Sequence, residues 1–261
     1  MMLIDGKEWR PISFVDQLVR AIQADAKTET RRVIRGVPYW DHFGRPIMDW
    51  ALSGCYIDDD DGQAWLDVQT DVDDNSHKKL TRPYGKAGDR LWVRECFSTF
   101  QLIEQATPDI PWVIAPSKIQ NADFVVFRDG AVKWHPEKRV QTTTKVQVER
   151  MASAKVEDIK FRPPMHLPFW AYRIGLEVKS IRIERLQEIT EGGACAEGFQ
   201  NGPFENFGEV SALFKFRKKW DVINGDRVDR SSGKAFTWDL NPFVWVVGFE
   251  RLKTAGKAGK S

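Results

Sequence analysis

The chain has 261 residues, of which 42% are hydrophobic and 11 are tryptophans, a composition typical of a folded globular protein rather than a disordered one. Its formal net charge is only +2, far below that of proteins that hold a long duplex through its phosphates. The composition therefore favours a local pocket over an electrostatic channel.

Three cysteines, Cys55, Cys96 and Cys195, are odd in number and far apart, with no CxxC or Cys/His ligand pattern around them. We therefore expect no disulfide framework, no metal and no cofactor. Residues 1–7 lack the apolar core of a signal peptide, and no apolar run is long enough to cross a bilayer. We expect a protein of the reducing cytoplasm with no membrane partner.

The first predicted element is a helix over residues 13–24. Ser13, followed by Asp16 three residues later, is typical of a capping-box-like start. The apolar side chains of the segment share one stripe, which consists of Phe14, Val15, Leu18, Val19 and Ile22.

A strand is predicted over residues 27–34, where the sequence begins Lys-Thr-Glu-Thr-Arg-Arg. An amine beside a hydroxyl is a possible nucleophile pair, and paired arginines suit a phosphate or a carboxylate. Lys27 and Thr30 lie three positions apart, so an ideal strand would send them to opposite faces. A joint role requires that Lys27 lies in the turn before the strand.

Residues 35–82 have the character of an insert. Two aspartate-rich runs, 58–62 and 71–75, bracket an alternating segment over 64–69, which predicts a hairpin with acidic tips. The spacing misses the EF-hand pattern, so we interpret the runs as solvated acidic loops rather than a calcium site.

The middle of the chain predicts further strands. A turn at 85–89 leads into a strand that ends near Glu95, and Asp129-Gly130 joins two strands over 122–127 and 131–134. Polar residues 138–155 are interpreted as a surface excursion. A long strand over 172–186 changes its apolar phase after Lys179, which predicts a bulge of the kind found at barrel corners.

The C-terminal part predicts two helices, a loop and a closing strand. Their ranges are 190–199, 205–223, 224–241 and 242–252, and the second helix has Phe207, Val210, Phe214 and Trp220 on one side. Strands that enclose a few helices without a βαβ repeat predict an α+β fold, a small β-barrel with peripheral helices and inserted hairpins. We expect one domain over 1–252, inserts at about 35–82 and 101–160, and a fraying tail over 253–261.

Three segments in this order resemble the ASCH family, small barrels of the PUA-like superfold. They are Ala-Lys-Thr-Glu-Thr-Arg at 26–31, Gly-Asp-Arg-Leu-Trp-Val-Arg at 88–94, and the segment over 186–199, which precedes a helix with Trp220 and the final strand. Residues 162–174 look like a version of the family common in prophages. The resemblance covers about half of the chain and leaves the acidic insert and residues 101–160 unexplained.

The resemblance implies a pocket directed at a nucleobase or at RNA. A small bacterial member of the family is an amidohydrolase on N4-acetylcytidine that uses a lysine, a threonine and a glutamate. Lys27, Thr30 and Glu197 stand at those positions. Other members look like RNA-binding or RNA-cleaving proteins.

Amide cleavage needs a nucleophile, a base and an acid for the departing amine. A desolvated Lys27 could lose its proton near neutral pH and draw one from Thr30 or water, while Glu197 protonates the leaving cytosine. The alternative reading is structural: Lys27 ends a helix, Thr28 and Thr30 are ordinary strand threonines, and Glu197 is solvated.

The other candidates are contacts to a base or phosphate. Alternation turns at least one of Arg31 and Arg32 away from any pocket. His166 could stack on a base or pack in its loop, and Trp170 could form a stacking wall or join the core. Arg173 should face away from Tyr172. The candidate binding residues are Thr28, Arg31, Arg32, His166, Trp170 and Arg173.

The expected cleft lies between residues 27–32 and the helix that carries Glu197. Its leading function is recognition of a nucleobase in RNA, a modified nucleoside or single-stranded DNA. One alternative is an amidohydrolase on N4-acylated cytidine or cytosine. Another is a phage accessory protein that binds a host protein and uses the barrel as a scaffold.

Overall fold

The computed structural model describes residues 2–35, 54–57, 64–69, 75–80, 83–107, 110–154, 156–228 and 235–253. Their fold is α+β. The α-helices of this part of the chain are α1 (Asp16–Gln23), α2 (Thr142–Ala154), α3 (Glu191–Ala196) and α4 (Ala212–Asn224). No helix within these ranges combines the length and the apolar character needed to cross a membrane.

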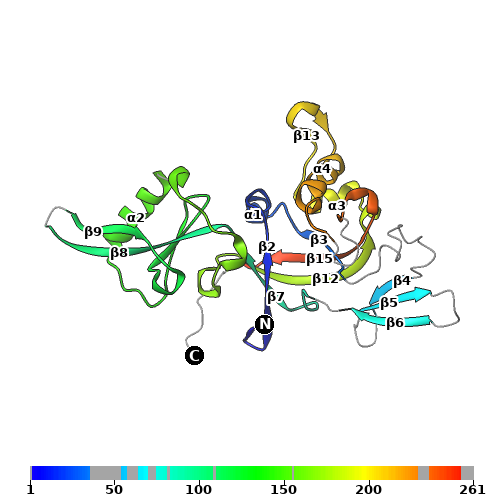
Figure 1. Ribbon diagram of the computed structural model, residues 1–261, viewed down its shortest axis with the longest axis horizontal. Coiled ribbons are helices and arrows are strands. Elements are labelled where there is room, and N and C mark those ends of the chain that lie inside the picture. Colours follow the sequence, from blue (N-terminus) through cyan, green and yellow to red (C-terminus); the bar gives the residue numbers. More distant parts are fainter. Residues whose placement is uncertain are drawn as a thin grey trace.

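The largest sheet runs through the centre of the molecule (Figure 1). Its strands follow the order β1 (Met2–Ile4), β2 (Lys7–Ser13), β7 (Arg90–Arg94), β12 (Gly175–Arg185), β15 (Phe243–Arg251) and β3 (Glu29–Val33). The neighbours pair antiparallel except for β2 and β7, which are parallel. The register places Arg31 of β3 opposite Val246 of β15, and Val246 opposite Arg182 of β12.

This sheet is open, so the predicted closed barrel is not found among the described residues. One edge is β3, and its outward backbone groups are taken by the segment at the end of α3. Thr28 N–H, just before the strand, donates to the carbonyl of Ala196 at 2.8 Å, and Arg31 N–H donates to the Glu197 side chain. These contacts occupy hydrogen-bonding positions that a closing strand would need.

Two smaller sheets flank the central one. The predicted insert over 35–82 contributes β4 (Gly54–Ile57), β5 (Ala64–Gln69) and β6 (Asn75–Leu80), while its acidic runs lie largely outside the described residues. The other sheet has the order β11 (Val132–Trp134), β10 (Phe124–Phe127), β8 (Phe97–Thr107) and β9 (Ile110–Pro116). Together with α2 it forms a lobe at one end of the molecule (Figure 1).

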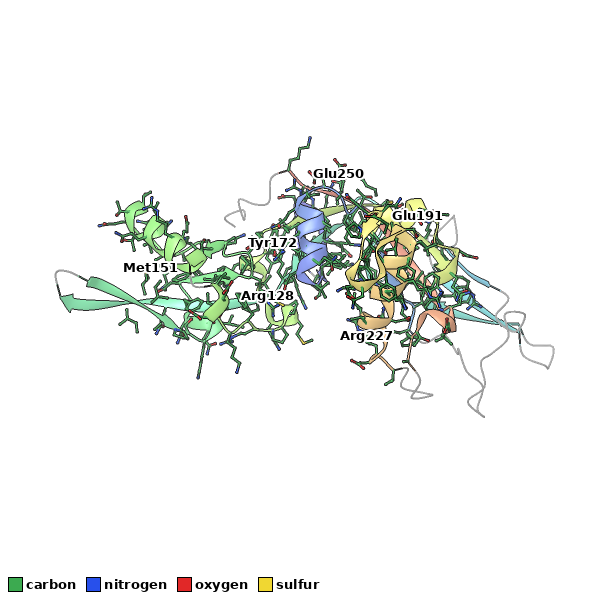
Figure 2. All side chains as sticks on the ribbon, turned by 90° about the horizontal axis from the view of Figure 1, so that it is seen from above. Arg128, Met151, Tyr172, Glu191, Arg227 and Glu250 are labelled. Carbon is green, nitrogen blue, oxygen red and sulfur yellow. The ribbon has the colours of Figure 1, made fainter. Side chains whose placement is uncertain are left out.

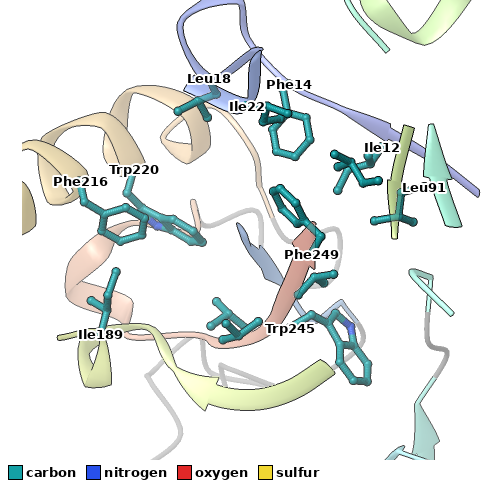
Figure 3. Packing of buried hydrophobic residues seen from close by; sticks show 14 of the residues in the cluster. Ile12, Phe14, Leu18, Ile22, Leu91, Ile189, Phe216, Trp220, Trp245 and Phe249 are labelled. Carbon is teal, nitrogen blue, oxygen red and sulfur yellow. The ribbon is translucent and has the colours of Figure 1, made fainter. Parts of the chain in front are cut away.

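Apolar side chains join these parts. The main core lies against the central sheet, and Figure 3 shows Phe14, Leu18 and Ile22 on one side of Phe249, with Phe216 and Trp220 of α4 on another. A second cluster connects the central sheet to the lobe. It contains Trp9 and Trp92 from the former, Phe97, Val125 and Phe127 from the latter, and Tyr172 from the segment before β12.

Helix α1 begins later than predicted. Residues up to Ser13 belong to β2, because this strand pairs with β7 through Ser13 and Arg94. Val15 occupies the N-cap without a side-chain hydrogen bond, so the predicted capping box is wrong. Val15 is 42% exposed, whereas the other residues of the predicted stripe are buried.

The second predicted C-terminal helix is also shorter than expected. Residues 205–210 form a short 3-10 helix, η7 (Glu205–Phe207), and a strand, β14 (Glu209–Val210), with Gly208 at φ +69° between them. Helix α4 starts after Ser211, whose hydroxyl accepts from Phe214 N–H at 3.2 Å. The supposed excursion over 138–155 contains α2.

Other predicted elements are confirmed. The hairpin at Asp129-Gly130 is formed by β10 and β11, and β7 and β15 follow their predicted ranges closely. The pairing of β12 with β15 shifts between Val178 and Ser180, which places the bulge at Lys179 as predicted.

Candidate functional site

Lys27 lies in the turn between α1 and β3, where a joint role with Thr30 requires it to be. The turn closes on the end of the helix, since Ala26 N–H and Lys27 N–H both donate to the carbonyl of Ala21. Asp25 has a φ of +55°, and β3 begins only at Glu29. The side chain of Lys27 is 0% exposed and points away from solvent.

Glu197 is the C-cap of α3, whose first turn is capped by the hydroxyl of Thr190. The next residue, Gly198, has a φ of +93°. A Cβ at Gly198 would lie 2.9 Å from Ala21 Cβ and 3.1 Å from Lys27 Cβ. The absence of this atom lets the end of α3 approach the end of α1, which brings Glu197 beside Lys27.

A buried ion pair joins Lys27 to Glu197 across 170 sequence positions. Lys27 Nζ donates to Glu197 Oε2, to the carbonyl of Glu29 at 2.7 Å and to the carbonyl of Glu197 at 2.9 Å. Glu197 Oε1 accepts from Arg31 N–H at 2.5 Å. All three ammonium protons thus have an acceptor, and both carboxylate oxygens have a donor.

Burial lowers the pKa of Lys27, and the negative charge of Glu197 opposes this effect. Arg31 and Arg32 lower the pKa of Lys27 further. With its ammonium fully bonded, Lys27 fixes the position of Glu197 instead of presenting a free amine.

Arg31 extends this charged cluster across the sheet. Its Nη2 lies 3.2 Å from Glu184, and its Nη1 lies 3.5 Å from Glu29 and 3.7 Å from Glu197. Arg182 pairs with Glu29 at 2.9 Å and with Glu184 at 2.5 Å. Nε and Nη1 of Arg31 are nevertheless buried without a hydrogen-bond partner.

A cavity of about 340 Å³ lies between β3, β2 and α4. Thr30, Arg31, Arg32 and Glu197 all line it, and the Thr30 hydroxyl makes no hydrogen bond to any described residue. Aromatic rings form much of its wall: Tyr84, Phe199, Phe216, Trp220 and Phe236. The volume is in the range of small-molecule sites, and the lining combines aromatic walls with many polar and charged side chains.

The cavity is rich in cations. Besides Arg31, its lining includes Arg32, Arg35, Lys219 and Arg227. Arg32 donates from Nη2 to the carbonyl of Ser13 at 2.7 Å and lies 5.0 Å from the centre of the Phe14 ring. Partial burial and the charges of Arg32 and Arg35 lower the pKa of Arg227.

Four of the candidate residues do not line this cavity. Thr28 is exposed just before β3. His166 is exposed at the end of η4 (Pro164–His166), and Trp170 in η5 (Phe169–Ala171) packs edge-to-face on His135 at 4.6 Å. Since these residues lie elsewhere, the structure does not bring them together with Glu197.

Arg173 is the fourth. It faces away from the cavity and binds Glu95 through both oxygens, with contacts of 2.6–3.1 Å, and lies 2.7 Å from Asp129. Its guanidinium also lies 4.2 Å from the centre of the Phe127 ring. These partners come from the junction between the central sheet and the lobe.

The sequence did not identify several cavity residues. Lys219, Arg227 and Phe236 reach the cavity only through the tertiary packing of α4 and the segments after it, and Tyr84 reaches it from the turn before β7. No local motif marks these residues. Cys96 is half-buried and Cys195 exposed, and neither is paired. The described residues contain no group of three or more metal-ligating side chains.

Comparisons with family models, with curated proteins and with solved structures found no match to this chain. The function is therefore argued from the geometry of the site and from the resemblance of its sequence segments.

Proposed function

We propose that this chain is an ASCH-type protein of the PUA-like superfold whose cavity recognises a nucleobase in RNA, a modified nucleoside or single-stranded nucleic acid. One observation carries the proposal: Thr30 and Glu197, from segments far apart in the sequence, line a single aromatic-walled cavity beside Lys27. These are the positions at which the sequence resembles the family.

The chemistry of the lining suits a base. The hydroxyl of Thr30 can donate and accept, and the Glu197 carboxylate accepts, so together they can read the polar edge of a heterocycle. Tyr84 is half-buried and lines the cavity, so its ring is the candidate for stacking on the base. Lys27 holds the Glu197 side chain in place during this recognition.

The test of recognition is calorimetric titration of the protein with the common nucleosides and N4-acetylcytidine. We expect Tyr84→Ala to weaken binding about tenfold, the cost of one lost stacking contact. Trp170→Ala is the matched control, because its ring lies outside the cavity. Equal losses in the two variants, or no binding by the folded wild type, would contradict the proposal.

Hydrolysis of an N4-acylated cytidine or cytosine is the second candidate function, and the proximity of Thr30, Glu197 and Lys27 favours it. In that reaction the acyl carbon takes a hydroxyl from water, the C–N bond breaks, and the amine leaves with a proton. In this scheme Glu197 moves the proton and Lys27 holds Glu197.

Mass spectrometry of the titration mixtures tests this candidate. Turnover predicts release of acetate from N4-acetylcytidine and its loss in Thr30→Val, which removes the hydroxyl with little change of shape. Thr28→Val should retain activity, because Thr28 lies outside the cavity. Binding without acetate release would support recognition and contradict hydrolysis. If the protein neither binds nor hydrolyses the nucleosides, the host-protein alternative is favoured.

A further inference from the structure

The cavity carries more positive charge than its own residues neutralise. Glu197 is its carboxylate, and Lys27 and Arg31 already bind both oxygens of that group. Among the described residues, no carboxylate lies within ion-pair distance of Arg32, Arg35, Lys219 or Arg227. Arg32 belongs to β3 and Arg35 lies two residues after this strand, while Lys219 belongs to α4 and Arg227 to the turn beyond it.

Some of this charge is hidden from water. Arg31 is only 5% exposed, yet its Nε and Nη1 have no hydrogen-bond partner, and Nε of Arg32 is likewise buried and unpaired. Buried donors of this kind cost free energy unless a ligand satisfies them. Both side chains line the cavity, so an anion bound there could accept these hydrogen bonds.

Arg227 completes the arrangement at the other wall. Its backbone is fixed at the end of α4, because Arg227 N–H donates to Asn224 at 2.9 Å and its carbonyl accepts from Phe236 at 3.2 Å. Figure 2 shows Arg227 at this end of the helix. The lowered pKa of Arg227 reflects partial burial next to Arg32 and Arg35, so the cations are close enough to act on one another.

We propose that Arg32, Arg35, Lys219 and Arg227 form a phosphate subsite, so that the cavity takes a phosphorylated nucleotide in preference to a free nucleoside. This inference rests on the proposed recognition of a nucleobase by the same cavity. The planar guanidinium of arginine can donate two parallel hydrogen bonds to phosphate oxygens. A phosphate dianion between clustered cations also relieves their mutual repulsion. The base then lies toward Thr30 and Glu197, and the phosphate toward Arg227.

The test compares each nucleoside with its 5′-monophosphate by calorimetry in low salt. The wild type should bind the monophosphate about tenfold or more tightly, the gain expected from one or more charge-assisted hydrogen bonds. The difference should shrink as salt rises, because Arg35 is exposed and Arg227 is only partly buried, so salt can screen both charges. A Lys219→Met/Arg227→Met variant should bind the two ligands equally.

Matched controls come from the same helix. Arg217 pairs with Asp239 at 3.6 Å, and Lys218 lies over Phe207 and Phe214, so neither lines the cavity. A Lys218→Met/Arg217→Met variant removes the same charge and should keep the preference for the monophosphate. Equal loss in both double variants would mean a general charge effect and would overturn the subsite.

The remaining outcomes separate the two proposals. Equal binding of nucleoside and monophosphate by the wild type overturns the phosphate subsite and leaves nucleobase recognition standing. Binding of inorganic phosphate, lost in Lys219→Met/Arg227→Met, with no binding of nucleosides supports the subsite and contradicts nucleobase recognition. Binding of none of these ligands overturns both.

A free nucleotide and a single strand share this phosphate chemistry. A dinucleoside monophosphate, which has only an internal phosphodiester, distinguishes them. Tight binding of this compound, sensitive to Lys219→Met/Arg227→Met, supports the subsite and assigns it to a strand. Binding of the monophosphate alone supports the subsite and assigns it to a terminal phosphate.

Discussion

Lys27 and Glu197 form the most deeply buried charged contact of the candidate site. Each side chain is held by backbone as well as by its partner: Lys27 by two carbonyls, and Glu197 by Arg31 N–H. A buried pair of this kind is costly to split, because the remaining charge loses its partner without regaining water. Such a pair can therefore fix the geometry of a site even though it adds little net stability.

Splitting the pair should destabilise the protein strongly. Glu197→Gln leaves the buried Lys27 ammonium without its counter-charge, and we expect a loss of about 3–5 kcal/mol in the free energy of unfolding. Lys27→Met/Glu197→Leu removes both charges and should recover most of this loss while it abolishes ligand binding. Urea denaturation measures the first effect and calorimetric titration the second. A double variant as unstable as Glu197→Gln would refute this account of the pair.

Glu29 should link stability to acid pH. Burial raises the pKa of Glu29, but the hydrogen bonds from Arg182 and the positive charges of Arg182, Arg31 and Lys27 together outweigh this and leave the pKa below its usual value of 4.5. A carboxylate with a lowered folded-state pKa stabilises the protein above its unfolded pKa, and this stabilisation is lost as pH falls through the folded value. Glu29→Gln should therefore lose less stability than wild type between pH 7 and pH 3. Parallel urea-midpoint curves for the two proteins would show that Glu29 makes no such contribution.

At the scale of elements, the site depends on how α3 ends. Gly198 turns the chain with a positive φ directly after Glu197, and its missing Cβ makes room for Ala21 and Lys27. The short helix thus delivers a carboxylate to the edge of β3, where a further strand would otherwise pair. The turn residue, rather than the helix itself, fixes the contact.

Two glycine substitutions in this segment should have opposite effects. Gly198→Ala must adopt a φ near +93° and meet Ala21 and Lys27, so we expect a loss of at least about 1–2 kcal/mol together with weaker ligand binding. Gly192→Ala lies inside α3 with its nearest neighbour 3.8 Å away, and should stabilise the protein by about 0.5–1 kcal/mol. Thermal unfolding distinguishes them. A neutral Gly198→Ala would contradict the role given to this turn.

Most strands could be predicted from alternation and turn residues, but several boundaries could not. Ser13 has the chemistry of an N-cap, yet parallel pairing with β7 keeps it in β2. The apolar spacing of Phe207 and Val210 continued the helical pattern of α4, although Gly208 and Ser211 were local signals of a later start. Tertiary pairing overrides a local preference in the first case. In the second case, the helical spacing of the apolar residues continued across the point where the helix is interrupted.

At the scale of the whole molecule, Arg173 is a structural connector rather than a ligand contact. It joins Glu95, between β7 and β8, to Asp129 in the β10–β11 turn, and so ties the central sheet to the lobe. Figure 2 shows Tyr172 and Arg128 in this junction, away from Arg227. Burial raises the pKa of Glu95 even though Arg173 opposes it, so the carboxylate depends on this partner.

Arg173→Met should therefore weaken the fold and spare the cavity. We expect a loss of about 1.5–3 kcal/mol, the range for hydrogen bonds to charged groups, with ligand binding unchanged in the folded fraction. Arg251→Met is the control, because Arg251 makes a similar two-oxygen contact with Asp25 at the surface, where such pairs contribute about 1 kcal/mol or less. If Arg173→Met keeps its full stability but binds the ligand more weakly, Arg173 belongs to the binding site after all.

The candidate site could be predicted only in part, because some of its residues reach the cavity through tertiary packing. Lys27, Thr30 and Glu197 could be named from a resemblance, and their proximity follows from a turn and a glycine that the sequence contains. The residues of the opposite cavity wall could not be identified from the sequence, because Lys219 and Arg227 reach the cavity through the packing of α4 against the core. The position of Arg173 could not be predicted from alternation with Tyr172, because β12 begins only at Gly175 and both residues lie before it.

We propose that the cavity at the edge of β3 holds a nucleobase, and a crystal structure of the protein soaked with a nucleoside 5′-monophosphate would show whether it does. We expect electron density for the base between Thr30, Glu197 and Tyr84, with the phosphate beside Arg227. A ligand bound elsewhere, or an empty cavity at a concentration that saturates the protein in solution, would contradict it.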